Sequence, residues 1–238
     1  MGRVMMSGIV PTLKAPVTGV LASSLAVGST VKLMEGGTAV EYLVVNQGIP
    51  ENSNLYDASC DGTWLLRKDI HSNRQWHTSD VNAYASSAIN TWLNGDFFNS
   101  LGSIEKATIK QVKIPYCFSS VEIISGENGL LTRVFLISFP EVGATKSMNT
   151  AFNMDGALLQ YFRAISVDPN RIAYENGTAI DWWLRSAYRS NSSFSGICTA
   201  GGGVGAYYAT TNYGVRPAVI LPSNALFDET TMLLKGVA

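Results

Sequence analysis

The sequence predicts a single α+β domain that follows an N-terminal arm, and three observations lead to this fold class. Charged residues make up only 15% of the 238 residues, compared with about 25% in an average soluble domain. Short apolar runs bounded by turn residues alternate with a few segments of helical periodicity. No unit of about 20 to 50 residues repeats, which excludes a solenoid.

The arm is predicted to span residues 1–30 and the domain residues 31–238. The arm is rich in small and apolar residues and is interrupted by Pro11 and Pro16, without a helical period. Such a segment cannot bury a core of its own. We therefore expect residues 1–29 to pack against another subunit or an assembly partner.

The first elements of the domain are predicted to be strands. Residues 31–33 and 40–45 are β-branched and flank a Gly-Gly pair, which predicts a hairpin. Residues 64–67 form a short apolar run typical of a buried strand. Residues 109–114 alternate between apolar and polar side chains and end at Pro115, which indicates a further strand.

Three helices are predicted. The clearest spans residues 79–94, with an apolar stripe at helical spacing, Asp80 as N-cap and Gly95 as terminator. A second, short helix begins at Ser103. Residues 152–163 carry the apolar side chains of a third helix.

The remaining strands are predicted from apolar runs. Residues 134–137 form a continuous run and predict a fully buried strand. Residues 182–184 and 215–221 are expected to be adjacent strands that hold the segment between them. Trp92 and Trp183 are expected to be nearly inaccessible core residues.

Charge, hydropathy and cysteine content exclude several protein classes. The formal net charge of -1 leaves no basic excess to neutralise phosphates, so no nucleic-acid partner is expected. No stretch approaches the roughly 18 apolar residues of a membrane helix, so no membrane insertion is expected. The three cysteines (Cys60, Cys117 and Cys198) show no disulfide or metal spacing, and we expect reduced thiols.

Residues that carry catalysis or bind cofactors are not recognisable in the sequence. His71 and His77 lack the spacing of a metal site, and no nucleophile motif or paired carboxylates occur. The glycine-rich residues 201–205 lack the Gly-Lys-Ser/Thr of a phosphate loop and a following helix. We expect no enzymatic activity, no cofactor and no metal.

The most unusual segment is residues 187–213. It holds four of the ten tyrosines, together with Ser, Gly, Ala, Thr and Asn, and contains no Lys, Asp or Glu. Such a composition is typical of antibody-like binding loops. The alternative is a glycine-rich surface loop whose tyrosines pack on the core, but exposing so many rings without purpose is costly. The side chains most able to contact a ligand are Tyr188, Arg189, Asn191, Phe194, Tyr207, Tyr208, Asn212 and Tyr213.

Two arginines lie at the ends of this segment. Arg185 and Arg216 can hydrogen-bond loop carbonyls or pair with a buried carboxylate, and the alternative role is contact with the ligand.

The motifs on both sides of the segment resemble a known family. Residues 182–186 read Trp-Trp-Leu-Arg-Ser and residues 214–218 read Gly-Val-Arg-Pro-Ala. Residues 91–94 and 134–138 fit the same pattern in the same order. This combination resembles a bacterial and phage domain family with a C-type lectin-like fold, in the branch of the formylglycine-generating enzymes. The resemblance covers residues 31–222.

Some proteins of this class are the variable proteins of diversity-generating retroelements, similar in role to phage tropism determinants. Those elements mutate template adenines, and every residue type in residues 187–213 can arise from an AAC codon in this way. The resemblance therefore implies a non-enzymatic protein that displays a diversified binding face on a phage tail in the virion or on a bacterial cell surface. It implies a protein or glycan ligand on a host or target cell, and homotrimers.

The sequence departs from two relatives of this class. Only residues 168–170, Asp-Pro-Asn, faintly match the motifs of calcium-dependent sugar-binding lectins. The reactive cysteine pair of the formylglycine-generating enzymes has no clear counterpart. Two alternatives remain: a structural protein that decorates a virion or surface, and an enzyme of the formylglycine-generating type. A mutated template repeat beside the gene would separate the first interpretation from both.

Overall fold

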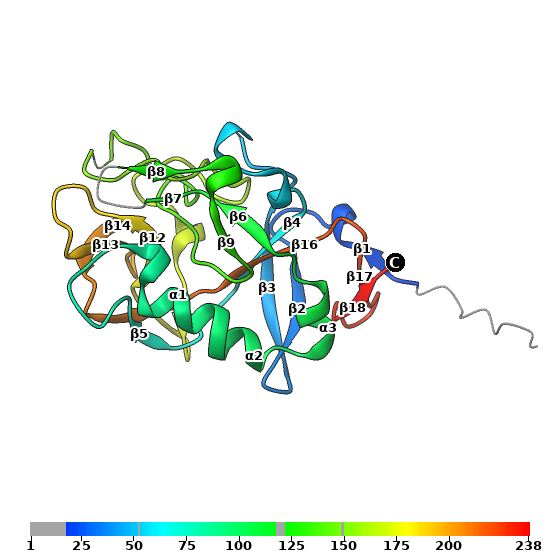
Figure 1. The fold of residues 1–238 in the computed structure, drawn as a ribbon. Coiled ribbons are helices and arrows are strands. Elements are labelled where there is room, and N and C mark those ends of the chain that lie inside the picture. Colours follow the sequence, from blue (N-terminus) through cyan, green and yellow to red (C-terminus); the bar gives the residue numbers. More distant parts are fainter. Residues whose placement is uncertain (1–17, 52, 118–121, 149) are drawn as a thin grey trace, which may run out of the picture.

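The computed structural model describes residues 18–51, 53–117, 122–148 and 150–238, and these form a mostly β structure with a few short helices (Figure 1). This confirms the α+β class. Two larger sheets and several small ones make up the described part of the chain. The predicted N-terminal arm is described only from residue 18, and residues 1–17 lie outside the described residues.

The four-stranded sheet is the first scaffold element. It has the order β16-β4-β3-β2 and is antiparallel throughout. The predicted hairpin is confirmed, because Glu35 and Thr38 pair across its turn and the two strands are antiparallel. Gly36 and Gly37 take φ values of 53° and 84° at this turn, which glycine adopts without strain. The predicted strand at residues 64–67 is confirmed as β4. The strands are β2 (Thr30–Glu35), β3 (Thr38–Gln47), β4 (Thr63–Arg67) and β16 (Ala218–Leu221).

The five-stranded sheet holds most of the unusual segment. Its order is β14-β13-β12-β15-β5, and only the β12 and β15 pair is parallel. Every residue of β12 is buried, as its apolar sequence predicts. The strands are β5 (Asn73–Gln75), β12 (Trp182–Ala187), β13 (Phe194–Cys198), β14 (Val204–Tyr208) and β15 (Asn212–Gly214).

A three-stranded sheet forms the opposite end of the molecule from β13 and β14 (Figure 1). It consists of β1 (Val20–Leu21), β17 (Ala225–Phe227) and β18 (Leu234–Val237). The last part of the predicted arm therefore packs on the C-terminal strands, and Ala22 is fully buried. Assembly through residues 1–29 stays a prediction.

Short strand pairs complete the β-structure. They are β6 (Val112–Ile114) with β9 (Leu130–Thr132), β7 (Tyr116–Cys117) with β8 (Ile123–Ile124), and β10 (Tyr174–Glu175) with β11 (Thr178–Ala179). The strand predicted before Pro115 is thus confirmed over its last three residues.

The predicted helix over residues 79–94 is wrong at both ends. The helix α1 (Ala88–Trp92) begins nine residues later, with the Ser87 hydroxyl accepting from the Asn90 backbone amide. It then runs through a π-helical turn (Leu93–Phe97) into α2 (Phe98–Ser100), so Gly95 does not end it. Asp80 accepts instead from the Thr210 hydroxyl at 2.7 Å. The helix predicted at Ser103 is confirmed as α3 (Ser103–Thr108).

Two other predicted elements are buried but irregular. Residues 152–163, all within the described part, form no helix, although Leu159 and Phe162 are buried as expected. Residues 134–137 are fully buried, yet they form only an isolated bridge between Phe135 and Ala218. The apolar side chains of both segments predicted that they are buried. They did not predict which backbone hydrogen bonds form.

The predicted adjacency of the strands on either side of residues 187–213 is wrong, and so is the predicted burial of one of the two tryptophans. Residues 182–184 and 215–221 are not adjacent strands, since β12 and β16 belong to different sheets. Trp182 of β12 pairs instead with Gly214 of β15, the residue before the range 215–221. Trp183 is fully buried as predicted, whereas Trp92 is only half-buried.

The described helices include none that is long and apolar enough to cross a membrane. The three cysteines are all buried and free, and burial raises the pKa of the Cys60 thiol to about 12.

Candidate ligand-binding face

Residues 187–213 form one side of the five-stranded sheet, including an exposed edge strand. They run from the end of β12 through β13 and β14 to the start of β15, with β14 as the edge strand. The segment is therefore an ordered part of the sheet and not a free loop. Tyr208 pairs with Phe194 and Tyr207 with Ser195 across β13 and β14.

The five aromatic side chains of this segment form one continuous line of ring contacts, which we call the aromatic row. Successive ring centroids lie 4.4 to 6.1 Å apart, within the range of favourable aromatic pairs. In order of contact the row consists of Tyr188, Phe194, Tyr208, Tyr207 and Tyr213.

Both ends of the row rest on buried rings. Tyr213 contacts Trp183 at 5.1 Å and Tyr188 contacts Phe152 at 5.1 Å, and both of these partners are fully buried. The middle of the row is open, because Tyr207 and Tyr208 are 46% and 47% exposed. The row is thus anchored at its ends and accessible at its centre.

The structure therefore separates the sequence-predicted ligand residues into two groups. Five of them are exposed and free to contact a partner: Arg189, Asn191, Tyr207, Tyr208 and Asn212. The other three are half-buried, because they pack on the core as well as on the row: Tyr188, Phe194 and Tyr213.

A hollow of about 280 Å³ lies next to the row, and no local pattern in the sequence predicts it. Asn212 lines it together with Asn73, Arg74, Gln75 and Trp92. The Arg74 guanidinium carbon lies 3.9 Å from the centroid of the Trp92 ring, in a cation–π contact. The hollow adds the amides of Asn73 and Gln75 and a second cation, Arg74, to a surface that already has Arg189 and Asn191.

Asn82 holds the backbone of the candidate face, and the sequence did not predict this role. Its side chain is buried, and its Nδ2 donates to the carbonyls of Tyr188, Asn191 and Phe194 at 2.8 to 3.3 Å. One amide thus fixes three points of the chain that carries the row. Local sequence could not reveal this role, since these partners lie more than 100 residues away.

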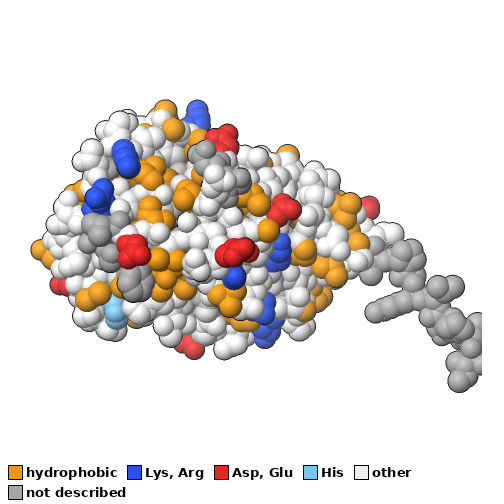
Figure 2. Space-filling view, turned by 45° about the horizontal axis from the view of Figure 1, so that its top comes forward, with side chains coloured by type: hydrophobic (Ala, Val, Ile, Leu, Met, Phe, Trp, Pro, Cys, Tyr) orange, Lys and Arg blue, Asp and Glu red, His pale blue; other side chains and the backbone are white. Residues whose placement is uncertain are grey.

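Charged side chains are scattered on the visible surface and form no continuous basic patch there (Figure 2). Within residues 187–213 the only charge is Arg189. Aromatic rings, amides and hydroxyls can stack on a ligand and hydrogen-bond to it. The described face is suited chemically to binding.

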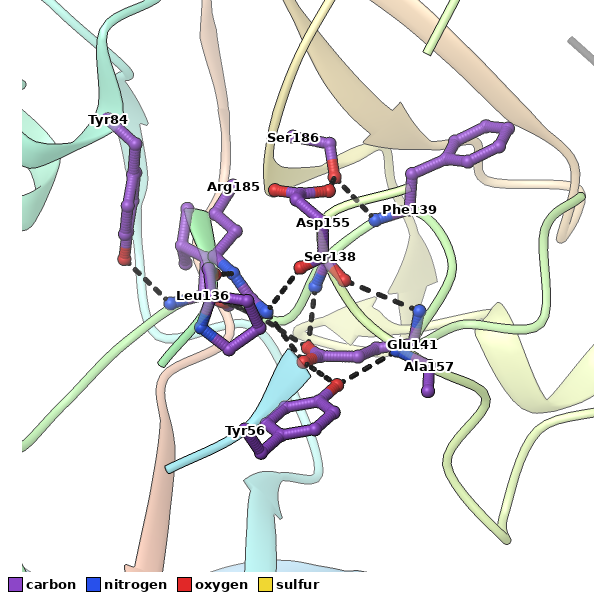
Figure 3. Close-up of polar contacts among 11 residues, drawn as sticks. Tyr56, Tyr84, Leu136, Ser138, Phe139, Glu141, Asp155, Ala157, Arg185 and Ser186 are labelled. Atoms are coloured by element: carbon purple, nitrogen blue, oxygen red, sulfur yellow. Dashed lines mark hydrogen bonds and ion pairs between the residues drawn. The ribbon is translucent and has the colours of Figure 1, made fainter. Parts of the chain in front are cut away.

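A buried ion pair holds the strand that leads into the face (Figure 3). Both terminal nitrogens of Arg185 in β12 lie 2.6 Å from the two carboxylate oxygens of Glu141. Tyr56 donates to the same carboxylate at 2.8 Å and the Ser138 amide does so as well. Arg185 also donates to three backbone carbonyls, those of Pro115, Leu136 and Asp155. Arg185 therefore pairs with a buried carboxylate and donates to carbonyls, which is the structural one of the two roles considered from the sequence.

Asp155 lies beside this pair and is also fully buried. One carboxylate oxygen accepts from the Ser186 hydroxyl at 2.5 Å, and the other has no hydrogen-bond partner among the described residues. Burial raises the pKa of Asp155 to about 6, with Arg185 opposing the shift. One guanidinium thus faces two carboxyl groups, which favours a proton on the second.

This arrangement predicts a pH-dependent stability. The folded-state pKa of Asp155 lies above its unfolded value of 3.8, so its contribution is complete below pH 4 and is lost as the pH rises through 6. Relative to Asp155→Asn, the wild type should lose about 2–3 kcal/mol of unfolding free energy from pH 4 to pH 7. Urea unfolding of both proteins across this range measures the difference, and a constant difference would contradict the assignment.

The comparison with Asp155→Asn is needed because His71 acts in the opposite direction. Burial, with Arg67 and Arg74 nearby, lowers the pKa of His71 to about 4. Its contribution is present above its unfolded pKa of 6.5 and is lost as the pH falls toward 4. Both proteins contain His71, so its effect cancels in the difference.

The remaining sequence motifs have structural roles. Asp168 of the Asp-Pro-Asn motif is buried and caps the turn Pro169–Arg171, accepting from the Asn170 amide at 3.0 Å. Gly202 takes a φ of 80°, and a Cβ there would lie 2.5 Å from the Asp168 carbonyl oxygen. Among the described residues, no group of His, Cys, Asp and Glu side chains could hold a metal ion.

A comparison with protein families gives one match. The family described as a domain of unknown function, DUF6273, matches residues 61–223. The matched range includes both larger sheets except β2 and β3, and it contains the whole aromatic row. No curated protein and no solved structure matches the chain.

Proposed function

This chain belongs to the DUF6273 family, and we propose that it is a non-enzymatic protein that binds a ligand through the aromatic row. The observation that carries the proposal is the exposure of Tyr207 and Tyr208 in the middle of a row whose ends rest on buried rings. Tyrosine rings give a large amphipathic contact at low entropic cost. A few such anchors at the centre of an interface usually supply most of its binding energy.

The surroundings of the row support binding of a macromolecular surface. Exposed Arg189, Asn191 and Asn212 belong to the same segment and offer adaptable hydrogen bonds around the rings. Asn82 and the Arg185–Glu141 pair hold the backbone of the segment and of β12. A face pre-organised in this way loses little conformational entropy on binding.

We further propose that the domain has a C-type lectin-like fold and is a variable protein of a diversity-generating retroelement. The motifs at residues 182–186 and 214–218 support this assignment, as does the restricted set of residue types between them. The ligand is then a protein or glycan on a host or target cell. The site of action is a phage tail or a bacterial surface.

Binding to whole surfaces tests the proposed function. Fluorescently labelled protein is incubated with a panel of intact bacterial cells and with an array of immobilised glycans. We expect saturable binding to a subset of surfaces, and dependence of that binding on Tyr207 and Tyr208. Binding that does not change when both rings are removed would contradict the proposal.

The diversification itself has a genomic test. We expect the DNA beside the gene to contain a near-copy of the codons for residues 187–213, with mismatches confined to template adenines. Sequencing the flanks from several isolates provides the measurement. If the isolates have identical residues 187–213 and lack the near-copy, the retroelement assignment is excluded. The chain would then be a binding domain whose face does not vary.

A further inference from the structure

The outer side of β14 is an unpaired edge of the five-stranded sheet, and we call it the β14 edge. The strand pairs with β13 over all five of its residues, from Val204 opposite Cys198 to Tyr208 opposite Phe194, without a bulge. No further strand pairs with its outer side in the described part of the chain. None of its five residues is buried, so the edge is accessible along its whole length.

The bonds at the two ends of β14 show which of its backbone groups point outward. The Gly203 carbonyl accepts from the chain on the β13 side, and the Ala209 amide donates to that side, both at 2.9 Å. In an antiparallel pair, residues that bond to the partner strand alternate with residues that face away from it. Every second residue from 203 to 209 therefore bonds toward β13, and the backbone groups of Val204, Ala206 and Tyr208 face outward.

Most of these outward groups have no hydrogen-bond partner. The Tyr208 carbonyl accepts from the Thr211 amide at 2.9 Å. Among the described residues, nothing bonds to the N–H and C=O groups of Val204 and Ala206 or to the Tyr208 N–H. Three donors and two acceptors are thus left free along the β14 edge.

The other edges of the two larger sheets are protected. At β2 the Lys32 amide donates to the Met232 carbonyl at 2.8 Å, and at β16 the Ile220 carbonyl accepts from the Lys110 amide at 2.9 Å. The edge strand β5 is only three residues long and has Arg74 at its centre. Covers, short strands, charges, prolines and bulges all keep an edge from accepting a further strand. The five-residue β14 edge has no charge, no proline and no bulge.

We propose that the β14 edge accepts an extended segment of a protein ligand, which adds a sixth strand to the five-stranded sheet. This inference rests on the proposed function and names the ligand class as a polypeptide with an exposed, extended segment. The free groups recur at every second residue, at intervals of about 6.6 to 6.8 Å. Another extended chain repeats its own donors and acceptors at the same interval, so each free group gains a partner.

The side chains of β14 favour an uncharged segment with β-branched or aromatic residues. Val204, Gly205 and Ala206 are small and leave room for larger side chains on the added strand. Tyr207 and Tyr208 are exposed at the other end, where aromatic or β-branched cross-strand neighbours are favourable. Pairing with a second copy of β14 would instead cover the two rings that the proposed function requires.

Binding of the full chain to an array of immobilised peptides tests this inference. The peptides have about seven residues, in which Thr alternates with Val, Ile, Phe or Tyr, and each has a twin with N-methylated amides. The twin keeps the side chains and loses the backbone donors. We expect some unmodified peptides to bind with dissociation constants of about 100 μM or below, and their twins at least about tenfold more weakly. No binding of any peptide at about 1 mM, or equal binding of the twins, would overturn the proposal.

Ala206→Pro removes the outward N–H at the centre of the edge. This N–H does not bond to β13, and proline is tolerated at such an edge position. Ala206→Val is the matched control, because it adds similar bulk and keeps the N–H. We expect Ala206→Pro to weaken peptide binding at least about tenfold and Ala206→Val to change it by about twofold at most. Equal affinities of the two variants would overturn the proposal. Where Ala206→Pro does not fold, Val204→Pro makes the same test at the first residue of the strand.

Two comparisons separate this inference from the proposed function. Binding to bacterial cells that requires Tyr207 and Tyr208 but is equal in Ala206→Pro and Ala206→Val would overturn the inference, while the proposed function would stand. Cell binding that does not depend on the two rings would contradict the proposed function itself. Light scattering identifies the remaining occupant: a wild type that dimerises and an Ala206→Pro variant that stays monomeric would assign the β14 edge to a second copy and overturn the inference.

Discussion

Replacing Arg185 with Met is expected to lower the free energy of unfolding by about 3–5 kcal/mol. The substitution leaves the fully buried Glu141 carboxylate without its counter-ion. It also removes the donor from the carbonyls of Pro115, Leu136 and Asp155. Chemical denaturation at pH 7 measures the loss, and we expect either a much lower midpoint or a protein that does not fold.

An exposed ion pair of the same length provides the control. Lys68 and Glu41 are also 2.6 Å apart, but both side chains are 44% exposed. Lys68→Met should therefore cost at most about 1 kcal/mol. Similar losses for Arg185→Met and Lys68→Met would mean that the buried network does not stabilise the scaffold.

Replacing Tyr207 and Tyr208 together with Ser is expected to weaken ligand binding by roughly 1,000-fold. The two rings are the exposed centre of the aromatic row. Removing two central aromatic anchors typically costs 2 kcal/mol or more for each. Titration of labelled protein on the cell or glycan surface that the wild type binds measures the loss.

Tyr174→Ser is the matched control for this double variant. Tyr174 is 45% exposed, almost the same as Tyr207 and Tyr208, but it lies in β10, outside the aromatic row. It should leave surface binding unchanged. Arg189→Gln should mainly slow association and reduce its salt dependence, because an exposed rim charge steers encounter. If Tyr174→Ser loses as much surface binding as the double variant, nonspecific adsorption through exposed aromatic rings would explain the binding.

Local signals were enough to predict two of the clearest elements of the sheets. The Gly-Gly turn at residues 36 and 37 sets a hairpin by itself, because few other residues tolerate positive φ at both positions. The run from Trp182 to Leu184 is apolar on both faces, as a strand buried on both sides requires. In both places the deciding interactions are local, so a single sequence contains them.

The predicted helix over residues 79–94 failed because distant partners decide its first half. Asp80 bonds to Thr210, and Asn82 bonds to three carbonyls of the segment with the aromatic row. Tyr84 is fully buried, as the apolar stripe predicted, but within a 3₁₀ turn. Apolar spacing predicts which side chains are inside, and tertiary hydrogen bonds then override the helix.

The candidate face was predicted in composition and not in detail. Five of the eight proposed ligand residues are exposed, but Tyr213 rests on Trp183 and is half-buried. The hollow with Arg74 and Trp92 joins residues of β5 and α1 to Asn212, and no local pattern links them.

Calorimetric unfolding of the Tyr207→Ser and Tyr208→Ser double variant tests most directly whether the aromatic row is a displayed face or part of the core. A displayed face loses only ring–ring contacts, which amount to about 1–2 kcal/mol. For a chain of this size the melting temperature should then fall by roughly 2–8 °C. Trp183→Ala, a truncation in the core, should cost about 3–5 kcal/mol in the same experiment. A double variant that melts as low as Trp183→Ala, or aggregates, would show that the rings belong to the core and would contradict the proposed binding face.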